Sequence, residues 1–195
     1  MLQKIISLVE QEFLEKPLAW TLEKGEVTFS VPTTLLLELI SCLKTNPSIL
    51  AEQLMDVCGV DYPGRAPRFE VVYHLLSLVK NIRLRVVVVV DDVTPVPSLV
   101  DLYPSAGWWE REAFDMFGIS FSGNPDMRRL LMEENFEGYP LRKDFPLSGY
   151  VEVRYDAAAK CVVQEPVSLP QEYRNFDFES PWEGMETIVE RRKPS

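Results

Sequence analysis

Residues 108–118 read WWEREAFDMFG, and the chain is organised around this stretch. Trp109, Ala113 and Met116 recur at the spacing of one helical face, which predicts a short helix with a buried stripe. Gly118 follows them in the position where glycine commonly ends a helix. The stretch therefore predicts one short helix that packs against a core and ends at Gly118.

The same helix carries an unusual density of acidic side chains. Glu110, Glu112 and Asp115 place three carboxylates within two turns, beside aromatic rings. Such groups must either face water or meet cations. Arg111 and Asp115 have the i, i+4 spacing of a helical ion pair. The other charged residues of a predicted polar interface follow soon after: Arg128, Arg129, Arg142, Lys143 and Asp144.

Two turn sequences interrupt this downstream region. Residues 123–126 (Gly-Asn-Pro-Asp) and 137–140 (Glu-Gly-Tyr-Pro) combine residues that favour turns. Between them, Arg128 and Arg129 place two guanidinium groups side by side, and guanidinium groups suit bidentate contacts with carboxylates. The mixture of local charges predicts a polar interface rather than a solvated tail.

The residues before the helix predict a compact α+β domain over residues 1–118. Apolar residues at helical spacing predict two helices, and alternating runs predict five strands. Their order is α-β-β-α-β-β-β, which predicts a two-layer sandwich with the sheet on one side and the helices on the other. The predicted ranges are 2–13 and 32–46 for the helices, and 18–22, 26–31, 54–61, 69–76 and 83–91 for the strands.

The run 83–91 is the most apolar of these strands. Beyond Arg85 it is apolar on both faces and contains five consecutive valines. A strand that is buried on both faces belongs near the middle of a sheet. Burial of the valines stabilises by about 1.5–3 kcal/mol each before entropy is counted. His74 lies on the polar side of the preceding strand and is expected to be a structural residue.

The sequence changes character within residues 119–195, for which we expect irregular, extended chain. Alternation predicts a short hairpin formed by 150–155 and 161–165, and prolines and large aromatic residues follow. A disordered tail would be poor in aromatic rings. We expect this tail to be ordered by docking on another chain, or alternatively to fold back on its own sheet. The expected anchors are Tyr173, Phe176, Phe178 and Trp182.

Composition excludes several classes of function. The net charge of −10 argues against nucleic acid as a partner, because non-specific affinity for it comes chiefly from Lys and Arg. The same charge disfavours direct adhesion to anionic lipid. No segment approaches the roughly 18 apolar residues that span a bilayer, and the N-terminus resembles neither a signal sequence nor a transit peptide. Membrane attachment is therefore expected only through partners.

The sequence offers no recognisable site for an electron carrier. Cys42, Cys58 and Cys161 lack C-x-x-C spacing, and His74 is the only histidine. No usual spacing of these residues makes a zinc or iron–sulfur site, so we expect no metal ligands. The sequence also lacks the glycine-rich loops that cradle nucleotides or flavins. If the protein belongs to a redox enzyme, it is expected to carry none of the electrons.

Four linked motifs together suggest a family. They are EREAFDMFG at 110–118, NPDMRR at 124–129, EGYPLRKDFP at 137–146 and SPWE at 180–183. In this order they resemble the C-subunit or 30 kDa subunit family of respiratory complex I, the proton-pumping NADH:quinone oxidoreductase. The resemblance covers residues 56–91 and 97–184. One departure is Asn124, which stands where the family signature has His.

The resemblance implies a cofactor-free connecting subunit in the peripheral arm, with no catalytic, cofactor-binding or metal-binding residues of its own. The complex transfers electrons from NADH through FMN and iron–sulfur clusters to quinone. The implied partners are the large quinone-site subunit, which the tail wraps, and the neighbouring iron–sulfur subunits. The implied location is the cytoplasmic face of the bacterial inner membrane or, alternatively, the matrix side of the mitochondrial inner membrane. On this reading the helix carboxylates meet cations of this chain and of a partner.

Two alternatives have different consequences. The chain could hold the equivalent place in a related complex, a photosynthetic NDH or a membrane-bound hydrogenase. It could instead be a stand-alone hydrolase that uses the helix carboxylates as general acid and base, although three acids on one short helix face different directions. The tail motifs at 173–178 and 180–183 resemble the respiratory type, which favours NADH and ubiquinone.

Overall fold

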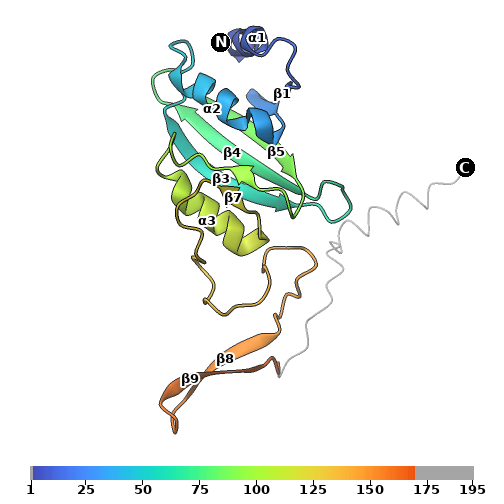
Figure 1. Cartoon of the computed structure of the whole chain (residues 1–195), viewed down its shortest axis with the longest axis vertical. Coiled ribbons are helices and arrows are strands. Elements are labelled where there is room, and N and C mark those ends of the chain that lie inside the picture. The colour runs from blue at the N-terminus through green and yellow to red at the C-terminus, as the bar shows by residue number, and fades with distance from the viewer. Residues whose placement is uncertain (1, 170–195) are drawn as a thin grey trace, which may run out of the picture. The chain divides into compact units, whose positions relative to one another are not determined.

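A computed structural model describes residues 2–169 of the chain (Figure 1). Its mixture of helices and strands confirms the α+β class expected from the sequence. The elements, in chain order, are α1 (Leu2–Glu12), β1 (Ala19–Glu23), β2 (Glu26–Ser30), the 3-10 helix η1 (Thr33–Leu35), α2 (Leu36–Thr45), β3 (Gln53–Asp61), β4 (Phe69–Ser77), β5 (Ile82–Val90), β6 (Val96–Pro97), α3 (Ala106–Phe117), β7 (Phe121–Ser122), β8 (Val151–Asp156) and β9 (Cys161–Pro166).

The chain divides into two compact units, residues 1–147 and residues 148–195. The first unit contains the large sheet, the helices and the irregular residues 119–147 that follow α3. The functional boundary expected after Gly118, between a folded core and a partner-wrapping segment, stays a prediction.

Five strands of the first unit form one sheet in the spatial order β1-β2-β5-β4-β3. Neighbouring strands are antiparallel except β2 and β5, which run parallel with Phe29 opposite Val86. β5 is the middle strand, as its apolar run predicts. Val86 and Val88 are fully buried, but Val89 is 44% exposed, so the expectation that both faces are buried is wrong. Within this sheet β5 is the last strand in sequence, and it joins the β1–β2 pair to the β3–β4 pair.

The helices pack against one face of this sheet. Alternate residues of β4 and β5, such as Tyr73 and Val86, form the core together with apolar residues of α1 and α2. Figure 1 shows α2 lying across the strands and α3 beside β3. The intervening residues lie on the opposite face, where His74 and Arg85 stay partly exposed. Within the described range, none of the helices is long and apolar enough to cross a membrane.

Helix α3 approaches strand β3 most closely at Gly59. A Cβ atom added to Gly59 would lie 2.7 Å from the Phe117 ring and 3.1 Å from the Ile119 side chain. Any other residue at this position would push α3 away from the strand, so the packing requires glycine here. Strand β3 thus fixes the position of α3 and of the charged side chains that α3 carries.

The second unit contains the β8–β9 hairpin that the sequence predicts. Its register places Val151, Val153, Tyr155 and Val162 on one face, where each side chain is between 53% and 62% exposed. The pair Arg154–Glu165, at 3.0 Å, lies on the other face. An isolated two-stranded hairpin is at best marginally stable in water. An apolar face this exposed is therefore suited to cover by another surface.

Candidate functional site

Helix α3 carries the acidic residues that the sequence singled out, and its end is well defined. Gly118 caps its C-terminus with a left-handed φ of 77°, which confirms the predicted end. A Cβ atom there would lie 2.6 Å from both Arg142 and Tyr139. In the predicted stripe Ala113 and Met116 are buried, whereas Trp109 is only half-buried. The following loop therefore folds tightly over the end of the helix.

Glu110 is completely buried. Its Oε1 accepts a hydrogen bond from the Leu99 backbone N–H at 2.7 Å, and its Oε2 accepts from Ser98 Oγ at 2.7 Å and Asn124 Nδ2 at 2.8 Å. These donors are neutral, so the expectation that Glu110 meets a cation is wrong. The reason is that uncharged donors from two flanking loops already satisfy both oxygens. Burial raises the pKa of Glu110, and the three hydrogen bonds oppose the rise.

Two neighbours complete the surroundings of Glu110. Asn124 donates to Glu110 and accepts a hydrogen bond from the Asp126 N–H at 2.9 Å, so both ends of its amide are engaged. An amide therefore serves as the side-chain donor from this turn. The Tyr73 hydroxyl has no hydrogen-bond partner among residues 2–169. Burial, followed by the charge of Glu110, raises the pKa of Tyr73 well above its ordinary value.

Asp115 is buried as completely as Glu110 but has different donors. Its Oδ1 accepts from Arg129 Nη1 at 2.7 Å, and its Oδ2 accepts from the backbone N–H groups of residues 130, 131 and 132 at 3.0, 2.7 and 2.8 Å. Burial acts to raise the pKa of Asp115, but these hydrogen bonds together outweigh it and lower the pKa. The segment 129–132 is thereby tied to α3.

The expected pair of Arg111 with Asp115 does not form, so that prediction is wrong. Arg111 instead donates to the carbonyl oxygens of Arg128 and Arg129 at 2.9 and 3.0 Å, and it lies 3.6 Å from Asp126. Asp115 is unavailable because its own oxygens are already filled by the 129–132 segment. Both residues of α3 therefore hold the same loop through different groups.

The two adjacent arginines that follow the first turn have different environments. The Arg129 side chain is 19% exposed and also donates to the carbonyl oxygen of Phe136 at 2.8 Å. The Arg128 side chain is 81% exposed and pairs with Asp126 at 2.7 Å, which lowers the pKa of Asp126. Within the described residues, Arg129 is thus the one member of the predicted basic set that meets a carboxylate of α3.

Arg142 and Lys143 do not reach the carboxylates of α3, contrary to the expectation. Arg142 Nε donates to the Phe117 carbonyl oxygen at 2.6 Å, and its guanidinium carbon lies 4.5 Å from the centre of the Tyr139 ring. The last carbonyls of a helix lack partners within the helix, which makes them the nearer acceptors. Lys143 contributes its backbone N–H, which donates to Asp61 Oδ2 at 2.7 Å.

Arg68 and Asp61 form an ion pair that the sequence reasoning missed. Arg68 donates to both oxygens of Asp61, at 2.6 and 2.8 Å, and to Asp144 at 3.0 Å. The hydrogen bond from Arg68 is the main cause that lowers the pKa of Asp61. The short loop 62–67 could have indicated this pair, because it joins the end of β3 to the start of β4 and so brings Asp61 close to Arg68. Asp144, a predicted interface residue, therefore pairs within this chain.

A separate group of ionisable side chains lies on the partly exposed face of the sheet. Asp56 and Cys58 of β3 and His74 of β4 bring three possible ligand atoms within 4.8 Å of one another. Burial, and next the charge of Asp56, raises the pKa of Cys58 to about 11; the charge of Glu112 on α3 adds a smaller rise. Motif spacing gives no sign of this group because the pairing of β3 with β4 creates it. The expectation that the chain has no metal ligands stays untested.

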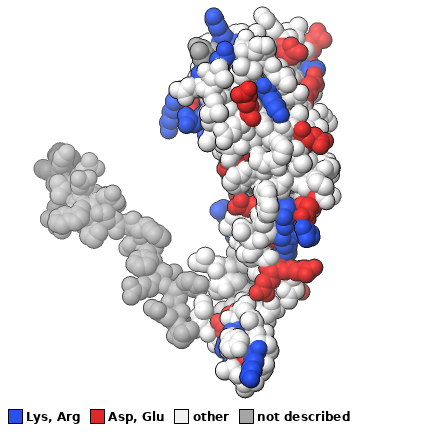
Figure 2. All heavy atoms as spheres, turned by 90° about the vertical axis from the view of Figure 1, so that its left-hand side faces the viewer, with Lys and Arg blue, Asp and Glu red and all other residues white. Residues whose placement is uncertain are grey.

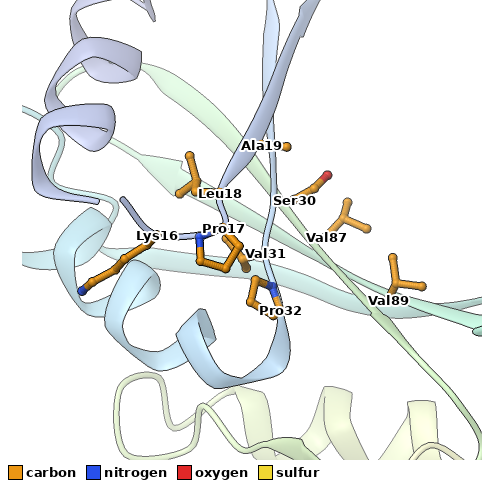
Figure 3. Close-up of a pocket in the computed structure, with 9 residues that line it drawn as sticks. All are labelled: Lys16, Pro17, Leu18, Ala19, Ser30, Val31, Pro32, Val87 and Val89. Atoms are coloured by element: carbon orange, nitrogen blue, oxygen red, sulfur yellow. The ribbon is translucent and has the colours of Figure 1, made fainter. Parts of the chain in front are cut away.

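A shallow groove of about 500 Å³ lies where β1 begins and β2 ends (Figure 3). Its lining is mostly apolar and includes Pro17, Leu18, Val31 and the valines 87 and 89 of β5. The carboxylates of α3 are not among its lining residues. The groove therefore does not bring an acid and a base to one place, as a hydrolytic site requires.

Charges are mixed on the surface. On the face drawn in Figure 2, acidic (red) and basic (blue) side chains lie interspersed over the described residues. A nucleic-acid site would instead gather Lys and Arg into one stripe or patch. The predicted anchors Tyr173, Phe176, Phe178 and Trp182 lie outside the described residues.

The fold and the site define a two-layer α+β protein whose charged side chains mainly fix its own loops. The family model for the respiratory-chain NADH dehydrogenase 30 Kd subunit matches residues 29–151. This match and the similarity to the relatives below confirm the resemblance seen in the motifs. The chain belongs to the family of the respiratory-chain NADH dehydrogenase 30 Kd subunit.

Three curated relatives show how far the similarity extends, and each is named as a C subunit of NADH-quinone oxidoreductase. The relative from Xanthobacter autotrophicus is 54% identical over 165 residues, which cover 85% of this chain and 79% of the relative. The one from Maricaulis maris is 55% identical over 170 residues, 87% of this chain and 85% of the relative. The relative from Rhizobium etli is 55% identical over 168 residues, 86% and 84% of the two chains.

Proposed function

We propose that this chain is a connecting subunit in the peripheral arm of complex I and carries no electron carrier itself. Its family and its relatives, which are named as C subunits of NADH-quinone oxidoreductase, support this role. The enzymatic activity then belongs to the whole complex, which transfers electrons from NADH through FMN and iron–sulfur clusters to quinone. The part of this chain is to hold neighbouring subunits together.

The use of the buried carboxylates is the observation that carries this proposal. Glu110 accepts three hydrogen bonds and Asp115 accepts four, all from groups of this chain. A general acid or base must reach the proton that it transfers. Both carboxyl groups are fully buried and engaged, so they suit structural anchors better than catalysts. A stand-alone hydrolase is therefore the weaker candidate.

We propose that the partner-binding part is the segment 119–195, and the β8–β9 hairpin supports this assignment most directly. Its face with Val151, Val153, Tyr155 and Val162 is more than half exposed, and covering it would remove apolar surface from water. The proposed neighbours are the large quinone-site subunit and the adjacent iron–sulfur subunits. Further proposed anchors in the tail are Tyr173, Phe176, Phe178 and Trp182.

We infer a peripheral location on the cytoplasmic face of the bacterial inner membrane, where other subunits would hold the chain. Relatives from bacteria support a bacterial host. Recovery of the chain with membranes, and its release when the complex is dissociated rather than when salt is raised, would test this location.

Affinity purification of the tagged chain in mild detergent tests the proposed function. We expect the other subunits of the complex to copurify, and flavin and iron–sulfur absorbance to appear in the complex but not in the isolated chain. A chain that purifies alone and colourless from a host with intact complex I would contradict the proposal. Copurification with the subunits of a hydrogenase or a photosynthetic NDH would favour the related complexes, and hydrolase activity of the pure chain would favour a separate enzyme.

The hairpin offers a matched pair of variants for the interface. Val162 and Val163 are adjacent residues of the same type that lie on opposite faces of β9. We expect Val162→Asp to lower copurification several-fold, because it places a charge on the apolar face. Val163→Asp is the control, since it faces Arg154 on the charged side. Equal copurification of the two variants would show that the apolar face is not the contact.

A further inference from the structure

Strands β3 and β4 place three different ligand types on one side of the sheet. Asp56 and Cys58 are two residues apart on β3, and side chains at this spacing point to the same face. His74 lies directly opposite Asp56 in the antiparallel register. A carboxylate, a thiol and an imidazole therefore converge from two hydrogen-bonded strands, and their ligand atoms lie within 4.8 Å of one another.

The distances within this group fit a bound cation better than a direct hydrogen bond between His74 and Asp56. His74 Nδ1 lies 3.7 Å from Asp56 Oδ2, which is long for a hydrogen bond. Two ligands of a tetrahedral ion with bonds of about 2.0–2.1 Å are separated by about 3.4 Å. The nitrogen and the oxygen are thus near that separation already, and the sulfur lies within 4.8 Å of both.

The group is open to solvent on one side. The side chains of His74 and Asp56 are 37% and 40% exposed, and Cys58 is half-buried between the strands. An ion could enter from water and retain a water molecule as a further ligand. The Cys58 thiol donates to the Val72 carbonyl oxygen at 3.9 Å, and a bound cation would replace the proton of this thiol.

Arg85 is the cation already present beside the group. It donates to His74 Nε2 at 3.3 Å, to Glu26 at 2.8 Å and to Thr28 at 3.4 Å. Glu26 and Thr28 can hold the guanidinium if it releases the imidazole. His74 could then carry its proton on Nε2 and offer the lone pair of Nδ1 to an ion between Asp56 and Cys58.

We propose that Asp56, Cys58 and His74 form a binding site for a divalent ion of the zinc type, with three protein ligands and one open position. Thiolate, imidazole and carboxylate are the three side-chain ligands that Zn²⁺ commonly takes. Because Zn²⁺ has no redox chemistry, such a site would brace β3 against β4 without making the chain an electron carrier. The site stands independently of the proposed place in complex I.

Titration of the metal-free, reduced full chain with Zn²⁺ tests the site, with Co²⁺ as a coloured substitute. We expect one equivalent to bind and Co²⁺ to show sulfur-to-metal charge-transfer absorption. Cys58→Ser should remove this absorption, and Asp56→Asn or His74→Gln should weaken Zn²⁺ binding by more than about tenfold. Cys42→Ser and Cys161→Ser are the matched controls and should bind as the unaltered chain does.

Three results would overturn the site: no saturable binding by the unaltered chain, equal loss in Cys161→Ser, or full binding by His74→Gln. Thermal unfolding of each variant without metal shows whether a lost site reflects a lost fold. The conservative change Asp56→Glu, which keeps the carboxylate, should retain more affinity than Asp56→Asn. Arg85→Gln should tighten Zn²⁺ binding, because it removes a positive charge and frees His74; weaker binding would place the ion elsewhere.

Discussion

Glu110 and Asp115 occupy the same helix and are equally buried, yet their pKa values shift in opposite directions. Desolvation is the largest influence on both groups. It prevails at Glu110, where the donors are neutral, and is outweighed at Asp115, where a guanidinium and three successive backbone N–H groups converge. Burial alone therefore does not decide in which direction the pKa of a carboxyl group shifts; the charge and number of its donors also matter.

The two regions around these residues also hold different parts of the chain. Glu110 ties α3 to Ser98 and Leu99 before it and to Asn124 after it. Asp115 ties α3 to the segment 129–132. Helix α3 is thus an anchor for loops on two of its sides, one through neutral groups and one through charge.

Removal of the charged anchor should have the largest effect. Asp115→Ala leaves Arg129 and three backbone N–H groups without their acceptor, and breaking a buried pair in this way costs about 3–5 kcal/mol. Denaturant unfolding of the chain measures this loss. Asp126→Ala removes a partly exposed carboxylate that pairs with Arg128 and lies 3.6 Å from Arg111; it is the control and should cost much less.

The same variant separates a structural role from a chemical one. In cells we expect Asp115→Ala to lower the amount of assembled complex while each assembled complex keeps its turnover. Normal amounts of an inactive complex would contradict the anchoring role and make Asp115 a catalytic candidate again.

Replacement of the neutral anchor should have a smaller effect. Glu110→Gln keeps the shape but turns an amide NH₂ toward groups that are themselves donors, which leaves one of them unsatisfied. The expected loss is about 1–3 kcal/mol in the free energy of unfolding. A loss as large as that of Asp115→Ala would mean that Glu110 has a charged partner after all.

The pH dependence of stability should differ in sign between the two sites, by at most about 1.4 kcal/mol per pH unit for each proton. The lowered pKa of Asp115 gives stability that is present above its unfolded pKa and is lost as the pH falls through its folded pKa. The raised pKa of Glu110 gives stability that is present below its unfolded pKa and is lost as the pH rises through its folded pKa.

Unfolding curves at several pH values would separate these contributions. The advantage of the unaltered chain over Asp115→Asn should shrink on acidification. The stability of the unaltered chain relative to Glu110→Gln should fall as the pH rises above the ordinary pKa range of glutamate. Parallel pH profiles for the two variants would show that the two carboxyl groups do not differ as described.

The smallest expected effect is at Asn124. Asn124→Ala removes one of the three donors to Glu110 and should cost about 1 kcal/mol. It should also raise the pKa of Glu110 further, because one hydrogen bond to its charged form is lost. Asn124→His offers an imidazole N–H in place of the amide and should recover part of the stability, which calorimetry can measure. No recovery would mean that an imidazole cannot replace the amide donor here.

More of the fold than of the site could be predicted from the sequence. Alternation and helical periodicity predicted the elements of the sheet layer, the apolar valine run predicted the central position of β5, and Gly118 marked the end of α3. These signals are local, since each depends on residues within one segment. The two-layer arrangement then follows from burying the apolar faces.

The partners of the charged residues could not be predicted from such local signals. Glu110 is satisfied in part by the backbone N–H of Leu99, and a backbone donor leaves no mark in the sequence. The pair of Arg68 with Asp61 and the approach of His74 to Asp56 depend on the register of neighbouring strands, which includes a β-bulge between Leu54 and Asp56. Side-chain chemistry predicted that the charged residues would form ion pairs or hydrogen bonds. Their partners depend on the register of the strands.

The central position of β5 has a consequence for how the protein is made. β2 pairs with only two strands of its sheet: β1, with which it forms a hairpin, and β5, which ends at Val90. While the ribosome is still producing the first half of the chain, Val27 and Phe29 have no neighbouring strand on that side. The β1–β2 hairpin must therefore wait, with the hydrogen-bonding edge of β2 unpaired, until β5 has emerged from the exit tunnel.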